Sequence, residues 1–561
     1  MLNRMLAAAT IAGLAIAGLA PAAAWAQANA PPAQAAPPEP QPSNEATGAS
    51  NIPPPVEQQE IAAPDAWSVS ALSRGNGALP ESLWSHSDPA FLATLFDRLP
   101  GAYESPAAQG LALRVLLSGG EAPRGDAQEA ARKRFEALGK MGAADPLATM
   151  AAGAGAALND PVIAQYAAQA ELARGNLDQA CMRGRAAQMG AVASPFLLRL
   201  RATCSAATGD RAAAELALAQ PHPASADDPW YTIAIEAVAG APPRRAPAAR
   251  YDNSLSTALS ISANFAPGPS PLAAASTMAL VTLARNDKAP ALQRAQAAAL
   301  AFRRGVISTQ EARQVLAATP ASVTTGLPSI AAALRTVAAE PGSLSAATAI
   351  AAVLRAAASP ADFAAAARFF RDDINGLQTA PDAASALQFA RAAIVNGDVG
   401  PAQRLTASAR QAGVEEAALG PVEAALAALL GVRSEQGTVA MHRRIDAAAS
   451  AAPAKRAAAR DVMILAALGA PLDGAVQSFI VENPPQGGAR AESGAMLALA
   501  SAVEYGALGD AALLATLAAG EGPARLDAES IDRIIRALRG VHLDDDARRF
   551  GVEALLAGAP G

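Results

Sequence analysis

Hydrophobic residues along most of this chain recur in runs that suit helices. From Asp65 onward, Ala- and Leu-rich runs of several helical turns alternate with short breaks that contain Gly, Pro, Asn or Asp. Alternation of β-branched with polar residues, which marks strands, is almost absent. The pattern therefore predicts an all-α fold, and the short breaks predict antiparallel helical hairpins in series. The clearest predicted helices span 160–174, 177–190, 195–208, 382–396, 399–412, 489–506 and 526–539.

Several of these hairpins carry Gly followed by Asp or Asn at the predicted turn. Two such pairs lie 34 residues apart, a spacing typical of helical-hairpin repeats. Small residues flank the first pair, Ala168 before it and Ala180 after it, as the close approach of two helices requires. The predicted turn pairs are Gly175-Asn176, Gly209-Asp210, Gly397-Asp398 and Gly509-Asp510.

These turn pairs and flanking alanines resemble those of the tetratricopeptide (TPR) family. The resemblance implies an α-solenoid, whose stacked hairpins present a concave binding surface. The pairs at 397 and 509 do not keep the 34-residue period, so we expect an irregular solenoid. A compact helical bundle, or two of them, is the alternative.

A segment dense in Pro and Arg interrupts the helical pattern at 241–250. Such a composition is typical of a boundary between packed regions. It predicts an N-terminal helical-repeat region over 65–240 and a C-terminal helical-repeat region over 251–561.

The first 26 residues have the features of a secretory signal peptide. Arg4 precedes an apolar stretch, Pro21 interrupts it, and Ala24-Trp25-Ala26 matches the small-residue cleavage rule. Cleavage between Ala26 and Gln27 predicts a periplasmic or secreted protein. The alternative is an uncleaved segment that anchors the chain in the inner membrane and faces it toward the periplasm.

Residues 27–64 form a Pro-, Ala- and Gln-rich segment with ten prolines and no Lys, Arg or aromatic residue. A segment of this composition cannot bury enough apolar surface to offset the entropy of ordering it. We expect a disordered linker between the signal segment and the helical body.

The chain has only two cysteines, Cys181 and Cys204. They fall in the predicted helices 177–190 and 195–208, at equal distances from the loop between them. Two residues at equal distances from the turn of an antiparallel hairpin lie at the same level along the two helix axes, so their side chains can meet. This placement predicts a disulfide in an oxidising compartment. Two buried free thiols are the alternative.

Charge and motif content argue against several function classes. The 44 basic and 50 acidic residues leave a net charge of −6, which disfavours nucleic acid as a partner. Outside the N-terminal segment no long apolar run is free of charge, so membrane contact is expected only through that segment if it is uncleaved. The sequence contains no nucleophile elbow, phosphate-binding loop or zinc-protease motif. We therefore predict no catalytic, metal or cofactor-binding residue and no enzyme activity.

Four aromatic residues, Trp67, Trp84, Trp230 and Tyr231, allow two interpretations. They could line a partner groove, because Trp and Tyr are enriched at binding hot spots. Alternatively, they fill the gaps that small alanines leave and cap the first hairpins.

The sequence thus predicts a non-enzymatic helical-repeat scaffold of the bacterial cell envelope, whose partners are envelope proteins. One alternative is a peptidoglycan-associated accessory protein or cryptic cell-wall enzyme. Glu492-Ser493 matches the start of the lytic transglycosylase motif, but the rest of that motif is missing. Another alternative is an Ala-rich surface or antifreeze-like structural protein.

Overall fold

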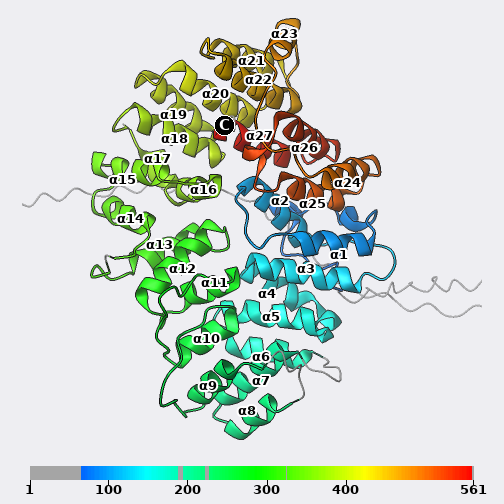
Figure 1. The fold of residues 1–561 in the computed structure, drawn as a ribbon, viewed down its shortest axis with the longest axis vertical. Helices are drawn as coiled ribbons and strands as arrows, with labels where there is room; N and C mark the ends of the chain where they lie inside the picture. The colour runs from blue at the N-terminus through cyan, green and yellow to red at the C-terminus, as the bar shows by residue number, and fades with distance from the viewer. Residues whose placement is uncertain (1–64, 188–193, 221–226, 324, 379, 559–561) are drawn as a thin grey trace, which may run out of the picture. The chain divides into compact units, whose positions relative to one another are not determined.

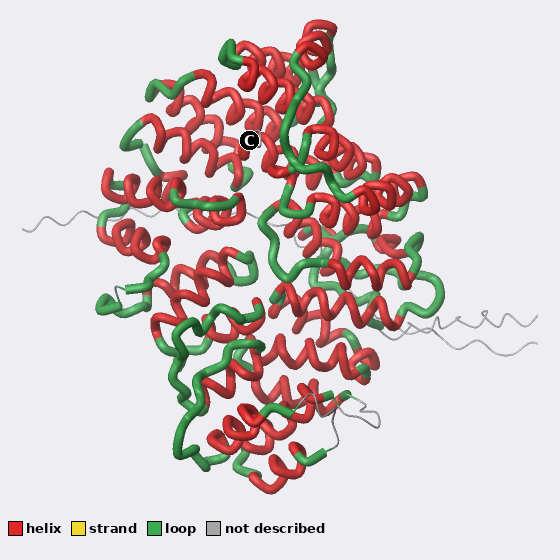
Figure 2. Tube along the Cα trace, in the orientation of Figure 1, coloured by secondary structure: helices red, strands yellow, loops and turns green. Residues whose placement is uncertain are grey.

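The computed structural model describes residues 65–187, 194–220, 227–323, 325–378 and 380–558. The predicted cleavage site at Ala26 and Gln27 and the predicted linker 27–64 lie outside these described residues. Within them the chain forms 27 α-helices, and Figure 2 shows only helix and loop there. The all-α prediction is confirmed.

Helix boundaries agree closely with the predicted runs. The 160–174 run becomes α5, 382–396 becomes α18 and 526–539 becomes α26. In chain order the α-helices are α1 (Pro89–Arg98), α2 (Pro106–Leu117), α3 (Gln128–Met141), α4 (Ala144–Gly153), α5 (Pro161–Ala173), α6 (Leu177–Ala186), α7 (Pro195–Ala207), α8 (Arg211–Leu218), α9 (Pro229–Val238), α10 (Ser254–Ser262), α11 (Thr277–Arg285), α12 (Ala291–Arg303), α13 (Thr309–Ala317), α14 (Ser329–Ala339), α15 (Leu344–Arg355), α16 (Pro360–Phe369), α17 (Arg371–Gly376), α18 (Ala383–Val395), α19 (Val399–Gln411), α20 (Glu416–Leu430), α21 (Glu435–Asp446), α22 (Ala452–Ala467), α23 (Gly474–Glu482), α24 (Ser493–Glu504), α25 (Leu508–Ala519), α26 (Ala528–Gly540) and α27 (Asp544–Ala557).

Neighbouring helices pack in pairs along the chain, as Figure 1 shows for α5 with α6, α18 with α19 and α24 with α25. Gly175, Gly209 and Gly397 lie at the turns of three such pairs with φ between 73° and 80°. Only glycine adopts this left-handed conformation without strain, so these residues let the chain reverse within a short turn.

The sequence pattern predicted a turn at Gly509-Asp510, and this prediction is wrong. Both residues are inside α25, and the turn before this helix is made by Gly506, which has φ 66°. Gly509 instead allows the ring of Trp84 to approach, because a Cβ atom at position 509 would lie 2.7 Å from that ring.

The first and last helices of the unit 62–561 pack against each other. Helix α2 contacts α25 and α27, and α1 contacts α25. Trp84, at the end of a 3-10 turn over Glu81–Trp84, is fully buried and meets Trp67 and Phe96 edge to face. This aromatic cluster connects the N-terminal helices to the C-terminal ones.

A buried arginine supports the same region. The Arg134 guanidinium of α3 is fully buried and donates hydrogen bonds to backbone carbonyl oxygens rather than to a carboxylate. Burial of a cation requires such partners, because an unpaired donor in the interior is costly. The acceptors are the carbonyl oxygens of Ala66, Trp67, Val69, Leu116 and Ser118.

The segment 241–250, expected to separate two repeat regions, lies between α9 and α10, and these two helices contact each other. Helices α10 and α11 also pack against α5, which belongs to the first half of the chain. Residues 62–561 form one compact unit by their contacts.

The disulfide prediction is confirmed. Cys181 of α6 and Cys204 of α7 are bonded, with their Cα atoms 6.0 Å apart. The bond joins two consecutive helices, as expected for two cysteines at equal distances from the loop that connects them.

Candidate functional site

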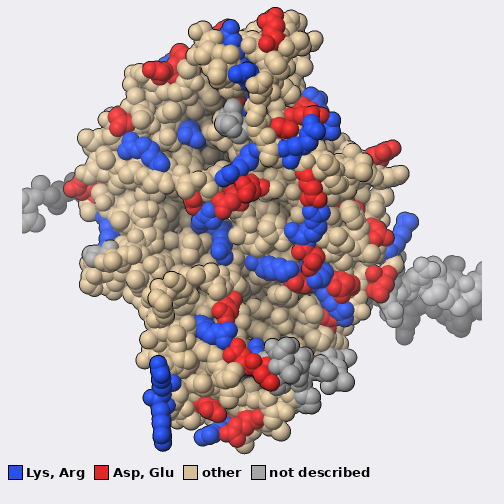
Figure 3. Space-filling view, in the orientation of Figure 1, with Lys and Arg blue, Asp and Glu red and all other residues tan. Residues whose placement is uncertain are grey.

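A cavity of about 880 Å³ lies near the two ends of the unit. Helices α2, α15, α16, α18, α20 and α27 contribute to its wall. Figure 3 shows acidic and basic side chains together at the centre of the visible face, in the region where Figure 1 places α2, α16 and α27.

Helix α27 supplies one whole face to this cavity. The lining residues on this helix recur every three or four positions, mostly as adjacent pairs, so they form a single stripe. The stripe begins with charged side chains and becomes apolar toward the end of the helix. It consists of Asp545, Arg548, Arg549, Val552, Glu553, Leu556 and Ala557.

Glu553 holds α27 to the start of α2. Its Oε2 atom accepts hydrogen bonds from the Ser105 hydroxyl at 2.9 Å and from the Ala107 backbone N–H at 3.0 Å. Ser105 is the N-cap of α2 and Pro106 follows it, so the carboxylate meets the positive end of that helix. The Oε1 atom is buried without a hydrogen-bond partner among the described residues. Burial raises the pKa of this carboxyl to about 7.

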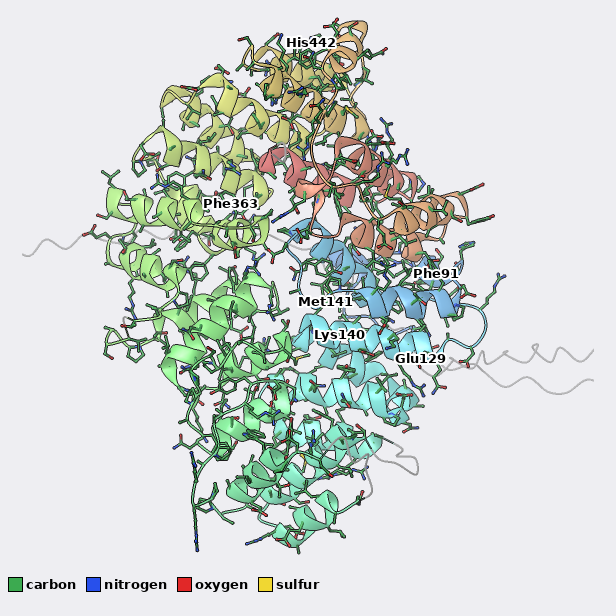
Figure 4. All side chains as sticks on the ribbon, viewed as in Figure 1. Phe91, Glu129, Lys140, Met141, Phe363 and His442 are labelled. Carbon is green, nitrogen blue, oxygen red and sulfur yellow. A yellow bond between two sulfur atoms is a disulfide. The ribbon has the colours of Figure 1, made fainter. Side chains whose placement is uncertain are left out.

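Arg391 of α18 is a half-buried cation in the wall of the same cavity. Its guanidinium donates to the Leu556 carbonyl at 2.9 Å and lies 5.1 Å from the ring centre of Phe363, which Figure 4 labels on α16. The Gln388 side chain is a weaker acceptor at 3.5 Å. Within the described residues no carboxylate lies within 4 Å of this guanidinium. Burial lowers the pKa of Arg391.

Three further arginines line the cavity, and each has a carboxylate partner. Arg548 pairs with Asp545 at 3.0 Å. Arg549 lies 3.8 Å from Asp546, and Arg355 lies 3.8 Å from Asp382. Three of the four arginines in the wall are therefore paired, and Arg391 is left without a carboxylate partner among the described residues, in a chain whose net charge is −6. This imbalance favours an anionic ligand.

A second feature is the outward face of α24. Gly494, Leu497 and Ser501 lie on one side of this helix, Tyr505 caps its C-terminal end, and all four are exposed. Leu497 is 76% exposed and Tyr505 is 73% exposed. Two large apolar side chains on one exposed helix face are suited to contact with another protein.

The aromatic residues considered for a partner groove are buried in the core. Trp67, Trp84, Trp230 and Tyr231 are each exposed by less than a tenth. The Trp230 indole donates to the Ala248 carbonyl at 2.9 Å, which secures the segment before α10. These side chains fill space between helices of the core.

The acidic run at the start of α27 serves as a set of ion-pair partners. Asp546 is buried and pairs with Arg114 of α2, and Asp544 pairs with Arg433. Within the described ranges no group of three or more His, Cys, Asp or Glu side chains is placed to hold a metal ion. None of the helices there combines the length and hydropathy needed to cross a bilayer.

Sequence reasoning did not find the cavity, because its residues come from six helices that are far apart along the chain. The one local indication is the charged start of α27, where Asp545, Arg548 and Arg549 share a helix face. No family model, curated protein or solved structure matches this chain.

Proposed function

We propose that this protein is an exported, non-enzymatic helical-repeat scaffold of the bacterial cell envelope that binds another envelope protein. The proposal includes an irregular TPR-like arrangement of its hairpins. Three glycine turns at 175, 209 and 397 and the serial pairing of helices support that arrangement. The Cys181–Cys204 disulfide supports a compartment outside the cytoplasm, because disulfides persist in oxidising surroundings.

The observation that carries the binding role is the exposed face of α24. Leu497 is exposed on α24 and Tyr505 is exposed at the C-cap of the same helix, which packs on α25 and α26. Isolated exposed leucines are common on protein surfaces, whereas an exposed Leu and Tyr on one helix face form a small apolar docking stripe. The partner would present a complementary apolar surface.

Site-specific photocrosslinking in live cells tests this role. A photoreactive amino acid replaces Leu497 or, separately, Tyr505, in a chain with a C-terminal tag. Leu344 on α15, which is 62% exposed, is the matched control position. We expect positions 497 and 505 to capture the same envelope protein, and position 344 not to capture it. Absence of a shared protein from 497 and 505 would contradict the scaffold.

The same experiment, repeated after digestion of the cell wall, addresses the peptidoglycan-associated alternative. That alternative is favoured by Glu553, because a buried carboxyl with a pKa near 7 beside a cavity is typical of an acid–base group. Capture of wall fragments, with protein partners lost on digestion, would favour the alternative. Protein capture that survives digestion would favour the scaffold.

A further inference from the structure

We propose that the cavity between α16, α18 and α27 binds a small organic anion with an apolar body, whose charged group pairs with Arg391. This ligand site is separate from the α24 face and does not depend on the scaffold role. It is defined by a cation that has no carboxylate partner among the described residues, an apolar wall and a volume suited to one small molecule.

Arg391 is positioned to receive the anion. Its guanidinium has five N–H donors, and among the described residues it uses the Leu556 carbonyl and, more weakly, the Gln388 side chain. The Phe363 ring supports its flat face at 5.1 Å. The group is therefore held in one orientation with donors still available. A half-buried cation so arranged binds carboxylate or phosphate strongly, because both partners are partly removed from water.

The rest of the wall suits an apolar body. Apolar side chains from α15, α16, α18, α20 and α27 face the space. They are Leu354, Phe363, Ile394, Leu429, Val552 and Leu556. A cavity of about 880 Å³ lies within the range that small-molecule sites occupy. A wholly polar anion such as inorganic phosphate would leave these side chains without a partner.

The acidic residues of the wall do not neutralise Arg391. Glu553 is held by Ser105 and Ala107, and Asp545 pairs with Arg548. Because burial raises the pKa of Glu553 to about 7, its carboxyl is largely neutral in mildly acidic solution. An incoming anion therefore meets the Arg391 guanidinium, which no carboxylate of the wall neutralises.

Calorimetric titration of the purified protein at pH 6 tests the proposal with four eight-carbon probes. Octanoate and octyl phosphate carry the two anionic groups, whereas octanol and octylammonium are neutral and cationic controls. We expect saturable binding of at least one anion, about tenfold or more tighter than either control. Binding of octanoate alone would assign the site to carboxylates, and binding of octyl phosphate alone to phosphate monoesters. Equal binding of octanol, or no saturable binding of either anion, would overturn the proposal.

Two variants locate the binding. Arg391→Gln should weaken anion binding about tenfold, since a charged hydrogen bond is lost. Arg335→Gln is its control, because Arg335 also donates to backbone carbonyls and lies outside the cavity. Ala358→Trp, at an exposed lining position in the loop between α15 and α16, should fill part of the cavity and weaken binding similarly. Ala352→Trp, at an exposed position of α15 that does not line the cavity, should not weaken it. If Arg391→Gln does not fold, the Ala358→Trp comparison decides. Unchanged anion binding in Ala358→Trp would overturn the assignment to this cavity.

Discussion

The carboxylate of Glu553 in the last helix accepts a hydrogen bond from the Ser105 hydroxyl at 2.9 Å, across 448 positions of sequence. This contact, with the bond from the Ala107 N–H, ties α27 to the first turn of α2. The two ends of the helical unit are thus held together by a buried acidic group as well as by apolar packing. Such a group makes the stability of the fold depend on pH.

We expect the free energy of unfolding to fall as the pH rises from about 4.5 to about 7. Burial raises the pKa of Glu553 from 4.5 to about 7 in the folded protein. Below pH 4.5 the carboxyl is protonated in both states, so it imposes no penalty. Between these values the unfolded chain releases the proton more readily than the folded one, which lowers stability by up to about 3 kcal/mol. Urea unfolding at pH 4.5, 6 and 8 measures this change.

Glu553→Gln should remove most of this loss, because the amide stays neutral at every pH. Asp510, whose pKa burial raises to about 6, should leave a residual slope of the same sign, to which Asp461 and Asp546 add because burial also raises the pKa of their carboxyls. Glu482→Gln is the matched control, since it makes the same charge change at an exposed position. A pH dependence in Glu553→Gln as large as in the unaltered protein would contradict the role given to this carboxyl.

Reduction of the Cys181–Cys204 disulfide should lower the free energy of unfolding by about 3 kcal/mol, because an open loop of this length gains entropy in the unfolded chain. Thermal unfolding with and without dithiothreitol measures the effect. The double variant Cys181→Ser, Cys204→Ser should unfold at the temperature of the reduced protein and should not respond to the reductant. An equal response in the double variant would show that the reductant acts elsewhere.

Local features of the fold were predictable from the sequence. The disulfide followed from the positions of Cys181 and Cys204 on either side of one loop. Helices such as α18 followed from an Ala-rich run of helical periodicity with a Gly break after it. These inferences depend only on residues close in sequence. Helical periodicity and turn glycines carry that information directly.

Contacts between distant segments were not predictable in this way. Gly509 has the same Gly-Asp pattern as the turn glycines, yet it is needed for the approach of Trp84 from the other end of the unit. Arg391 and Glu553 carry no motif, because their significance depends on helices brought together only in the folded chain. In an Ala-rich sequence, small residues fit many helix pairings, so the pattern alone does not select the partners.

Arg134→Lys should destabilise the protein by about 2–4 kcal/mol, although it preserves the charge. The guanidinium reaches carbonyl oxygens from Ala66 to Ser118, whereas one ammonium group cannot contact all of them. Urea unfolding measures the loss. Arg404→Lys is the control, since Arg404 donates to two carbonyl oxygens at a more exposed site and should lose about 1 kcal/mol or less. Similar losses in both variants would contradict the special role of Arg134.

Gly509→Ala should destabilise the packing between the two ends of the unit, even though alanine favours helices. Its Cβ atom would lie 2.7 Å from the Trp84 ring and 2.9 Å from the Leu83 carbonyl oxygen, so backbone or ring must move. Overpacking of this kind costs about 1–3 kcal/mol, more than the helix propensity that alanine gains. Gly400→Ala in α19 is the matched control, because no packed neighbour among the described residues lies within 4 Å of its added Cβ. This variant should leave the free energy of unfolding unchanged or raise it by about 0.5 kcal/mol.

Hydrogen exchange should show faster exchange in α2 and α25 of Gly509→Ala, with α5 and α6 unaffected. Equal exchange in α25 of the two variants would mean that the ends of the unit do not depend on the contact between Gly509 and Trp84.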